Sequence, residues 1–100
     1  MATLTAEERK TSTLIKPPSM YKVVFNNDDK TPMEFVVEIL IHLFHHERVV
    51  ATAIMEEVHL KGKGVAGVYS YEIADQKAIE ATSLARANGY PLSVTIEVNE

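Results

Sequence analysis

The sequence contains no cysteine, which excludes a disulfide, a thiolate nucleophile and a thiolate metal site. It also lacks an excess of positive charge, because ten Lys and Arg against 14 Asp and Glu give a formal net charge of −4. A protein that binds nucleic acid regardless of sequence needs a basic face to displace counterions from the phosphates. The charge therefore argues against this class and favours cationic or neutral partners.

Long hydrophobic runs are absent as well. No apolar stretch approaches the ~20 residues that cross a bilayer, and the N-terminus lacks the charged-then-apolar pattern of a secretory signal. We therefore expect a cytoplasmic protein. Its 100 residues, of which 46% are hydrophobic and 24% charged, allow one modest core but not a second, so we expect a single folded domain.

Motifs for catalysis or metal binding are also scarce. Asp28, Asp29 and His59 are acid–base groups, but no serine on a glycine-flanked elbow is present to serve as their nucleophile. His42 and His46 are one helical turn apart, but no carboxylate or thiolate at helical spacing completes a metal site. The residues by themselves therefore indicate neither an enzyme nor a metalloprotein.

Hydrophobic periodicity predicts six elements in the order strand, helix, helix, strand, helix, strand. The strands are expected at Tyr21–Phe25, Val65–Ser70 and Leu92–Val98, and the helices at Thr31–His46, Arg48–Leu60 and Tyr71–Ala87. Strands separated by helices that pack on one face give a two-layer α+β domain, with a three-stranded antiparallel sheet and three helices. We expect the other face of the sheet to be solvated, in keeping with Ser93, Thr95 and Glu97 on the last strand.

A cluster of two amides and two carboxylates, residues 26–29, stands before a strong helix-start signal. Thr31 is the predicted N-cap, Pro32 suits the first helical position, and Glu34 completes a capping box. Asn and Asp are ordinary turn residues, so the cluster can serve the turn alone. However, the positive end of a helix favours one carboxylate and does not need two. The surplus favours a binding site in a loop held by a strand and a helix.

The chemistry of this cluster suits a small cation. Carboxylates, an amide carbonyl and a neutral histidine such as His59 are hydrogen-bond acceptors, and a primary ammonium offers several donors to them. If the ammonium is the α-ammonium of a peptide, the adjoining side chain needs apolar lining, which Met33, Val36 and Met55 can provide. Met55 and His59 are four residues apart and therefore share one helical face.

The same residues form a family motif. Asn27-Asp28-Asp29-x-Thr31-Pro32-Met33-Glu34-Phe35 is preceded by Lys16-Pro17-Pro18-Ser19-Met20-Tyr21, and followed by Met55-x-x-Val58-His59, Gly62-Lys63, Gly67-Val68 and Pro91-Leu92. From Lys16 to Glu97 the chain resembles ClpS, the bacterial adaptor family of the N-degron pathway. The resemblance implies a non-enzymatic monomer without cofactor or metal. Such an adaptor captures proteins with Phe, Tyr, Trp or Leu at the N-terminus and hands them to the unfoldase ClpA of the ClpAP protease.

The resemblance also implies residue roles. The contacts to the substrate α-amino group fall on Asn27, Asp29 and His59, with Asp28 beside them. The walls of the side-chain pocket fall on Asn26, Thr31, Met33, Val36, Met55 and Leu92, with Met33 as a gate against β-branched residues. The contacts to the ClpA N-terminal domain fall on Glu72 and Lys77. Residues 1–19 match a flexible N-terminal extension needed for delivery, and residues 20–100 match the adaptor domain.

The implied fold is like that of the C-terminal domain of the ribosomal stalk protein. The alternative function is therefore a stalk-like protein docking domain without N-degron binding. Such a domain should share the fold but lack the constellation of Asn27, Asp29 and His59.

Two residues depart from the family pattern. Asn26 replaces the usual aliphatic pocket residue, and Lys30 stands where an aromatic residue is common. Burying an amide against an apolar side chain costs ~1–3 kcal/mol unless the amide finds a partner, so we expect Leu to bind less well than Tyr, Phe or Trp. We also expect binding to weaken in mild acid, because protonated His59 loses its acceptor nitrogen and sets a positive charge beside the ammonium.

Overall fold

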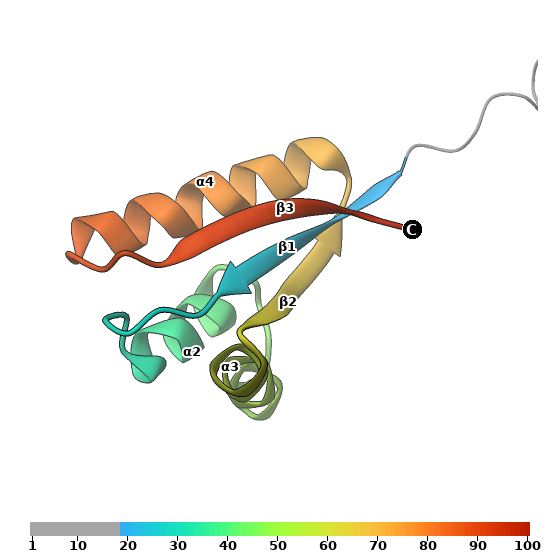
Figure 1. Cartoon of the computed structure of the whole chain (residues 1–100). Helices are drawn as coiled ribbons and strands as arrows, with labels where there is room; N and C mark the ends of the chain where they lie inside the picture. Colours follow the sequence, from blue (N-terminus) through green and yellow to red (C-terminus); the bar gives the residue numbers. More distant parts are fainter. Residues whose placement is uncertain (1–18) are drawn as a thin grey trace, which may run out of the picture.

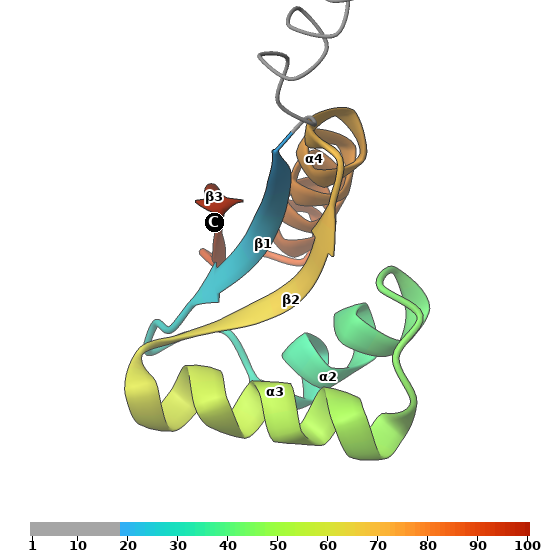
Figure 2. The same cartoon turned by 90° about the vertical axis from the view of Figure 1, so that its right-hand side faces the viewer.

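The computed structural model describes residues 19–100; the predicted flexible extension, residues 1–19, lies outside this part apart from Ser19. In chain order, the elements are β1 (Met20–Asn26), α2 (Met33–His42), α3 (Arg48–Lys61), β2 (Lys63–Tyr69), α4 (Tyr71–Ala87) and β3 (Ser93–Asn99). The strands form one antiparallel sheet with the order β2-β1-β3. Helix α4 lies along this sheet. Helices α2 and α3 lie side by side near the end of the sheet where β2 begins (Figures 1 and 2). The predicted α+β fold and element order are confirmed.

The sheet and α4 pack closely because the contact face of the helix is made of alanines. This stripe is fully or almost fully buried, and its members are Ala74, Ala78, Ala81 and Ala85. At the other end of the domain, Phe25 of β1 is completely buried and meets the ring of Phe44 edge-on, with 5.4 Å between ring centroids. Large aromatic side chains fill the space that the small residues leave. The C-terminal end of β1 is therefore fixed against the core, just before the polar cluster begins.

The start of α2 differs from the prediction. Thr31 is not the N-cap, because its hydroxyl donates to Asp28 Oδ2 at 2.8 Å. Pro32 occupies the N-cap position without a side-chain cap, and its carbonyl accepts the first helical bonds, from the N–H groups of Phe35 and Val36. The predicted capping box with Glu34 is therefore not formed. The threonine is used by the preceding turn rather than by the helix.

The end of α2 also differs, because the helix stops at His42 rather than His46. Leu43 is the C-cap, and His45 then adopts a left-handed backbone conformation with φ 62°. This turn is held by the His46 backbone N–H, which donates to the Leu40 carbonyl at 3.1 Å. Apolar spacing alone extends the helix too far, because Leu43 and Phe44 remain packed in the core after the helix has ended.

The sheet face away from the core carries the expected polar residues, but one apolar side chain is covered there. Val24 is only 1% exposed, although it alternates with the core-facing Val23 and Phe25. Lys63 lies opposite Asn26, two residues beyond Val24, and forms a 3.1 Å ion pair with Glu97, which lies opposite Lys22 on the other edge strand. This pair therefore crosses the central strand on the face that carries Val24.

Among the helices of residues 19–100, none is long and apolar enough to cross a membrane.

Candidate functional site

The turn between β1 and α2 is organised by Asp28. Its Oδ1 accepts from the backbone N–H groups of Lys30 and Thr31, at 2.8 and 2.7 Å, and its Oδ2 accepts from the Thr31 hydroxyl. Burial works to raise the pKa of the Asp28 carboxyl, but these hydrogen bonds and the nearby positive charge of Arg86 hold it below its usual value. Asp28 therefore shapes the turn and is ionised at neutral pH.

A backbone contact joins this turn to the end of α3. The Asn27 N–H donates to the Gly62 carbonyl at 2.9 Å. Gly62 ends α3 with φ 92°, a left-handed conformation that a glycine adopts without steric cost. Because His59 lies in the last turn of α3, the contact brings it beside the polar turn. Two segments more than 30 residues apart thus form one site.

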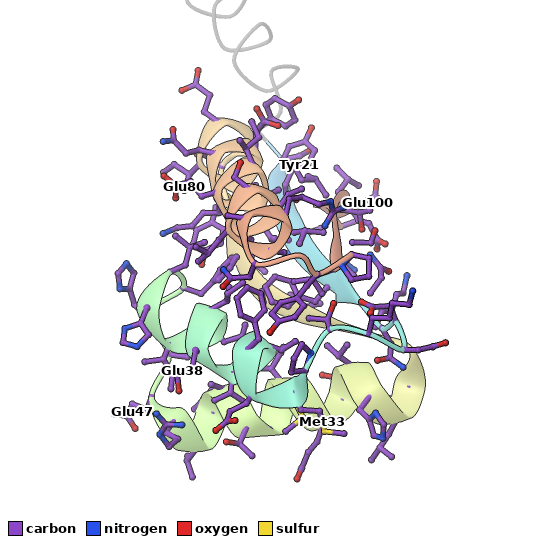
Figure 3. All side chains as sticks on the ribbon, turned by 90° about the vertical axis from the view of Figure 1, so that its left-hand side faces the viewer. Tyr21, Met33, Glu38, Glu47, Glu80 and Glu100 are labelled. Carbon is purple, nitrogen blue, oxygen red and sulfur yellow. The ribbon has the colours of Figure 1, made fainter. Side chains whose placement is uncertain are left out.

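The site is a pocket of about 270 Å³, including its open mouth. Residues from five segments line it: Asn26, Asn27, Asp28, Thr31, Met33, Val36, Met55, Val58, His59 and Leu92. Figure 3 shows Met33 at the start of α2, beside α3, where its side chain is 47% exposed. Leu92, in contrast, is 1% exposed and belongs to the core. The pocket therefore combines a buried wall at Leu92 with an exposed thioether at Met33, a side chain that adapts its shape readily.

This pocket brings together every residue predicted to contact the substrate except Asp29, which is exposed and outside the lining. The side chains of Asn27, Asp29 and His59 form no hydrogen bond with another residue of the described part. Asp28, by contrast, has both carboxylate oxygens occupied. The acceptors left for a ligand are therefore Asn27 and His59 on the lining, with Asp29 next to it in the chain.

Asn26 lies in the pocket lining, but its amide has partners. The side-chain nitrogen donates to the Ser93 carbonyl and to Thr95 Oγ1, both at 3.2 Å. Asn26 thus ties the end of β1 to the start of β3. The expectation of weak leucine binding rested on an unpartnered amide, and this premise is not met. The preference itself stays a prediction, which peptide binding can measure.

The two residues assigned to a protein interface lie on α4, in a separate cleft. Glu72 and Lys77 line it together with Ile73, Gln76 and Glu80, and its volume is about 640 Å³. Lys77 Nζ donates to the Leu43 carbonyl at 2.8 Å and lies 5.9 Å from the Phe44 ring centroid. Lys77 therefore holds the end of α2, while Glu72 is exposed and available for a partner.

His42, at the end of α2, and His46, in the turn after it, do not form a metal site. His42 Nε2 bonds Glu38 at 3.0 Å, and His46 Nε2 donates to the Ala66 carbonyl at 2.6 Å. Within residues 19–100, no group of three histidine or acidic side chains is arranged to hold a metal ion.

Two further residues contribute to the site. Val58 lines the pocket, whereas the sequence motif contains it between Met55 and His59 without assigning it a role there. Arg86, on the last turn of α4, donates from Nη1 to the Tyr90 and Leu92 carbonyls. No sequence pattern predicts these contacts, because a carbonyl carries no residue identity.

Comparisons with known proteins show the family of this chain. The family model of the ATP-dependent Clp protease adaptor protein ClpS matches residues 16–95. The ATP-dependent Clp protease adapter protein ClpS of Shewanella denitrificans is 48% identical over 83 residues, covering 83% of this chain and 81% of the relative. The protein of the same name from Serratia proteamaculans is 46% identical over 90 residues, covering 90% and 85%.

A solved structure is also similar. It is the structure of Agrobacterium tumefaciens ClpS2 bound to L-phenylalaninamide, with a TM-score of 0.80 and 38% sequence identity. The match covers 83% of this chain and 100% of the ClpS2 chain. Family model, relatives and structure agree over most of the sequence, so this chain belongs to the ClpS family of Clp protease adaptors.

Proposed function

We propose that this chain binds proteins through a bulky hydrophobic N-terminal residue and delivers them to the ClpA unfoldase of the ClpAP protease. The observation that carries this proposal is the pocket itself. Acceptor groups that have no hydrogen-bond partner among residues 19–100 border apolar walls, and this combination matches a free α-ammonium attached to an apolar side chain.

The polar part of the proposal concerns the ammonium. Asn27 and His59 offer an amide carbonyl and an imidazole nitrogen, and Asp29 adds a negative charge beside them. A primary ammonium has three N–H donors and one positive charge. Hydrogen bonds to a charged group contribute ~1.5–3 kcal/mol each, so an acetylated N-terminus, which has no charge and one donor, should bind poorly.

The apolar part concerns the first side chain. Val36, Met55, Val58 and Leu92 present only carbon and sulfur atoms to the pocket, and Met33 lies near its mouth. Transfer of a Leu or Phe side chain from water into such a site contributes ~1.5–3 kcal/mol. The ligand of the similar ClpS2, L-phenylalaninamide, has this same pair of features, a free α-amine and a benzyl side chain.

The first test is fluorescence anisotropy with short peptides that differ only at residue one: Phe, Tyr, Trp, Leu, Val or Met, each with a free or an acetylated α-amine. We expect the free-amine peptides with Phe, Tyr, Trp or Leu to bind selectively. Equal binding of free and acetylated peptides would contradict the ammonium site. The chain would then be a docking domain that shares the fold without recognising N-degrons.

Delivery to ClpA is assigned to the α4 cleft. Glu72 is the sharper probe, because replacing Lys77 also releases the end of α2. Glu72→Lys should leave peptide affinity unchanged and reduce degradation of an N-degron substrate by ClpAP. Glu56→Lys, at an exposed position on α3, makes the same charge change outside the cleft and serves as the control. Normal degradation with the Glu72 variant would place the ClpA contact elsewhere.

A further inference from the structure

The segment between α4 and β3 supplies one wall of the pocket through Leu92. Arg86 holds this segment from the last turn of α4. Its Nη1 donates to the Tyr90 carbonyl at 3.0 Å and to the Leu92 carbonyl at 2.8 Å. Both donors of one guanidinium nitrogen are thus used on the main chain around the pocket wall.

Other contacts also hold this segment, and one of them is the bond from the Tyr90 backbone N–H to the Ala85 carbonyl at 2.8 Å. The Tyr90 ring meets Phe35 of α2 edge-on, with 4.8 Å between centroids. The Ser93 carbonyl accepts from the Asn26 amide. Leu92 therefore lies between contacts to α4, α2 and β1, of which Arg86 makes two.

Arg86 also relates to the opposite loop of the site. Its positive charge is one of the influences that lower the pKa of Asp28 in the turn before α2. The guanidinium is thus near both loops that form the pocket, yet it is not among the lining residues. Arg86 thus bonds the main chain at a lining residue, Leu92, without lining the pocket itself.

We propose that Arg86 is a positioning residue that fixes the Leu92 wall, and thereby sets which first side chains the pocket accepts. This inference rests on the proposed N-degron function. Without the guanidinium, the Tyr90 and Leu92 carbonyls lose their donor, and the wall is no longer held at one distance from the other lining residues. A pocket with a movable wall discriminates less between side chains of different shape.

The test compares Phe-first and Val-first peptides by anisotropy on the wild type, Arg86→Ala and Arg86→Lys. We expect the ratio of the two dissociation constants to fall about three- to tenfold in Arg86→Ala, the range set by losing one or two ordinary hydrogen bonds. Arg86→Lys keeps the charge and N–H donors, so it should retain most of the ratio. Arg48→Ala removes an arginine that pairs with Glu38, outside the lining, and should leave the ratio unchanged.

The ratio separates positioning from a loss of stability. Partial unfolding lowers the apparent affinity for every peptide by the same factor, so it does not change the ratio. An unchanged ratio in Arg86→Ala would overturn the proposal for Arg86 while leaving the N-degron function intact. A wild type that binds free and acetylated peptides equally would instead overturn the proposed function.

Discussion

Helix α2 is bounded by two turns that both carry polar side chains. They differ in which of these side chains remain available to bind a ligand. The turn before it, residues 27–32, contains acidic and amide side chains. The turn after it, residues 43–47, contains two histidines and a glutamate. Figure 3 shows them at opposite ends of the helix, with Met33 marking the first and Glu47 the second.

The two turns also differ in which of their groups form hydrogen bonds. In the first turn, Asp28 accepts three bonds from the turn itself, and Asp29 is left without an intramolecular hydrogen bond in the described part. In the second turn, His46 donates to the Ala66 carbonyl, and the Leu43 carbonyl accepts from Lys77 of α4. Binding capacity thus depends on which groups remain after folding has used the others.

The largest loss of peptide affinity is expected when the carboxylate of Asp29 in the first turn is neutralised. Asp29→Asn should weaken binding of a free-amine Phe-first peptide by about 10- to 100-fold, the range for losing a hydrogen bond to a charged group. The free energy of unfolding should change by less than ~0.5 kcal/mol, because the side chain is exposed.

Glu57→Gln is the matched control for this variant. Position 57 is about 200° around α3 from Met55 and His59, so it loses the same charge on the other side of the helix. Equal losses of affinity in both variants would mean that net charge, and not a local contact, attracts the peptide.

Acidification should also weaken peptide binding, though less than Asp29→Asn does, because it protonates His59. Binding should weaken severalfold in mild acid, because a protonated imidazole repels the ammonium and offers no acceptor. His59→Gln keeps an acceptor that does not titrate, so its affinity should depend little on pH. The same pH dependence in both proteins would assign it to another group.

Removing the organiser of the first turn should mainly affect stability. Asp28→Ala should lower the free energy of unfolding by about 1–2 kcal/mol at neutral pH, as for loss of a capping side chain. Because folding lowers the pKa of Asp28, its contribution is complete above the unfolded value near ~3.9 and disappears as the pH falls through the lower folded value. Urea unfolding of both proteins at several pH values measures this. A difference that persists at the lowest pH would contradict it.

The smallest effect is expected in the second turn. His45→Gly should stabilise the protein by up to ~1 kcal/mol, because the left-handed conformation strains a residue with a Cβ. The same substitution at His42, inside the helix, should destabilise it by a similar ~1 kcal/mol. Thermal unfolding of the two variants checks this, and shifts of the same sign would refute it.

Sequence reasoning succeeded where local signals agree with tertiary packing. The bounds of α4 were predicted correctly, because a continuous alanine stripe is followed by Asn88-Gly89 and then Pro91. It failed at Thr31, where two partners compete for one hydroxyl. A cap and a turn have the same residue preferences, and only the position of Asp28 decides between them.

The candidate site shows the same division. Met55 and His59 could be placed on one face from their spacing, since helical periodicity is local. The expectation that Asn26 burdens the pocket depended on where its side chain points, and the contact of Asp29 with the ligand stays a prediction. Position along a motif does not determine this, because neighbouring strands offer partners that the motif does not contain.

The sequence by itself determined the element order, the polar turn and the family, because periodicity, capping residues and motif spacing are properties of short segments. Only the tertiary structure decided which polar groups stay free, since Asp28 forms hydrogen bonds within its own turn and Asn26 forms them with β3. It also decided that Arg86 holds the Leu92 wall. These outcomes depend on backbone carbonyls and N–H groups brought together by packing, and every residue has the same carbonyl whatever its side chain.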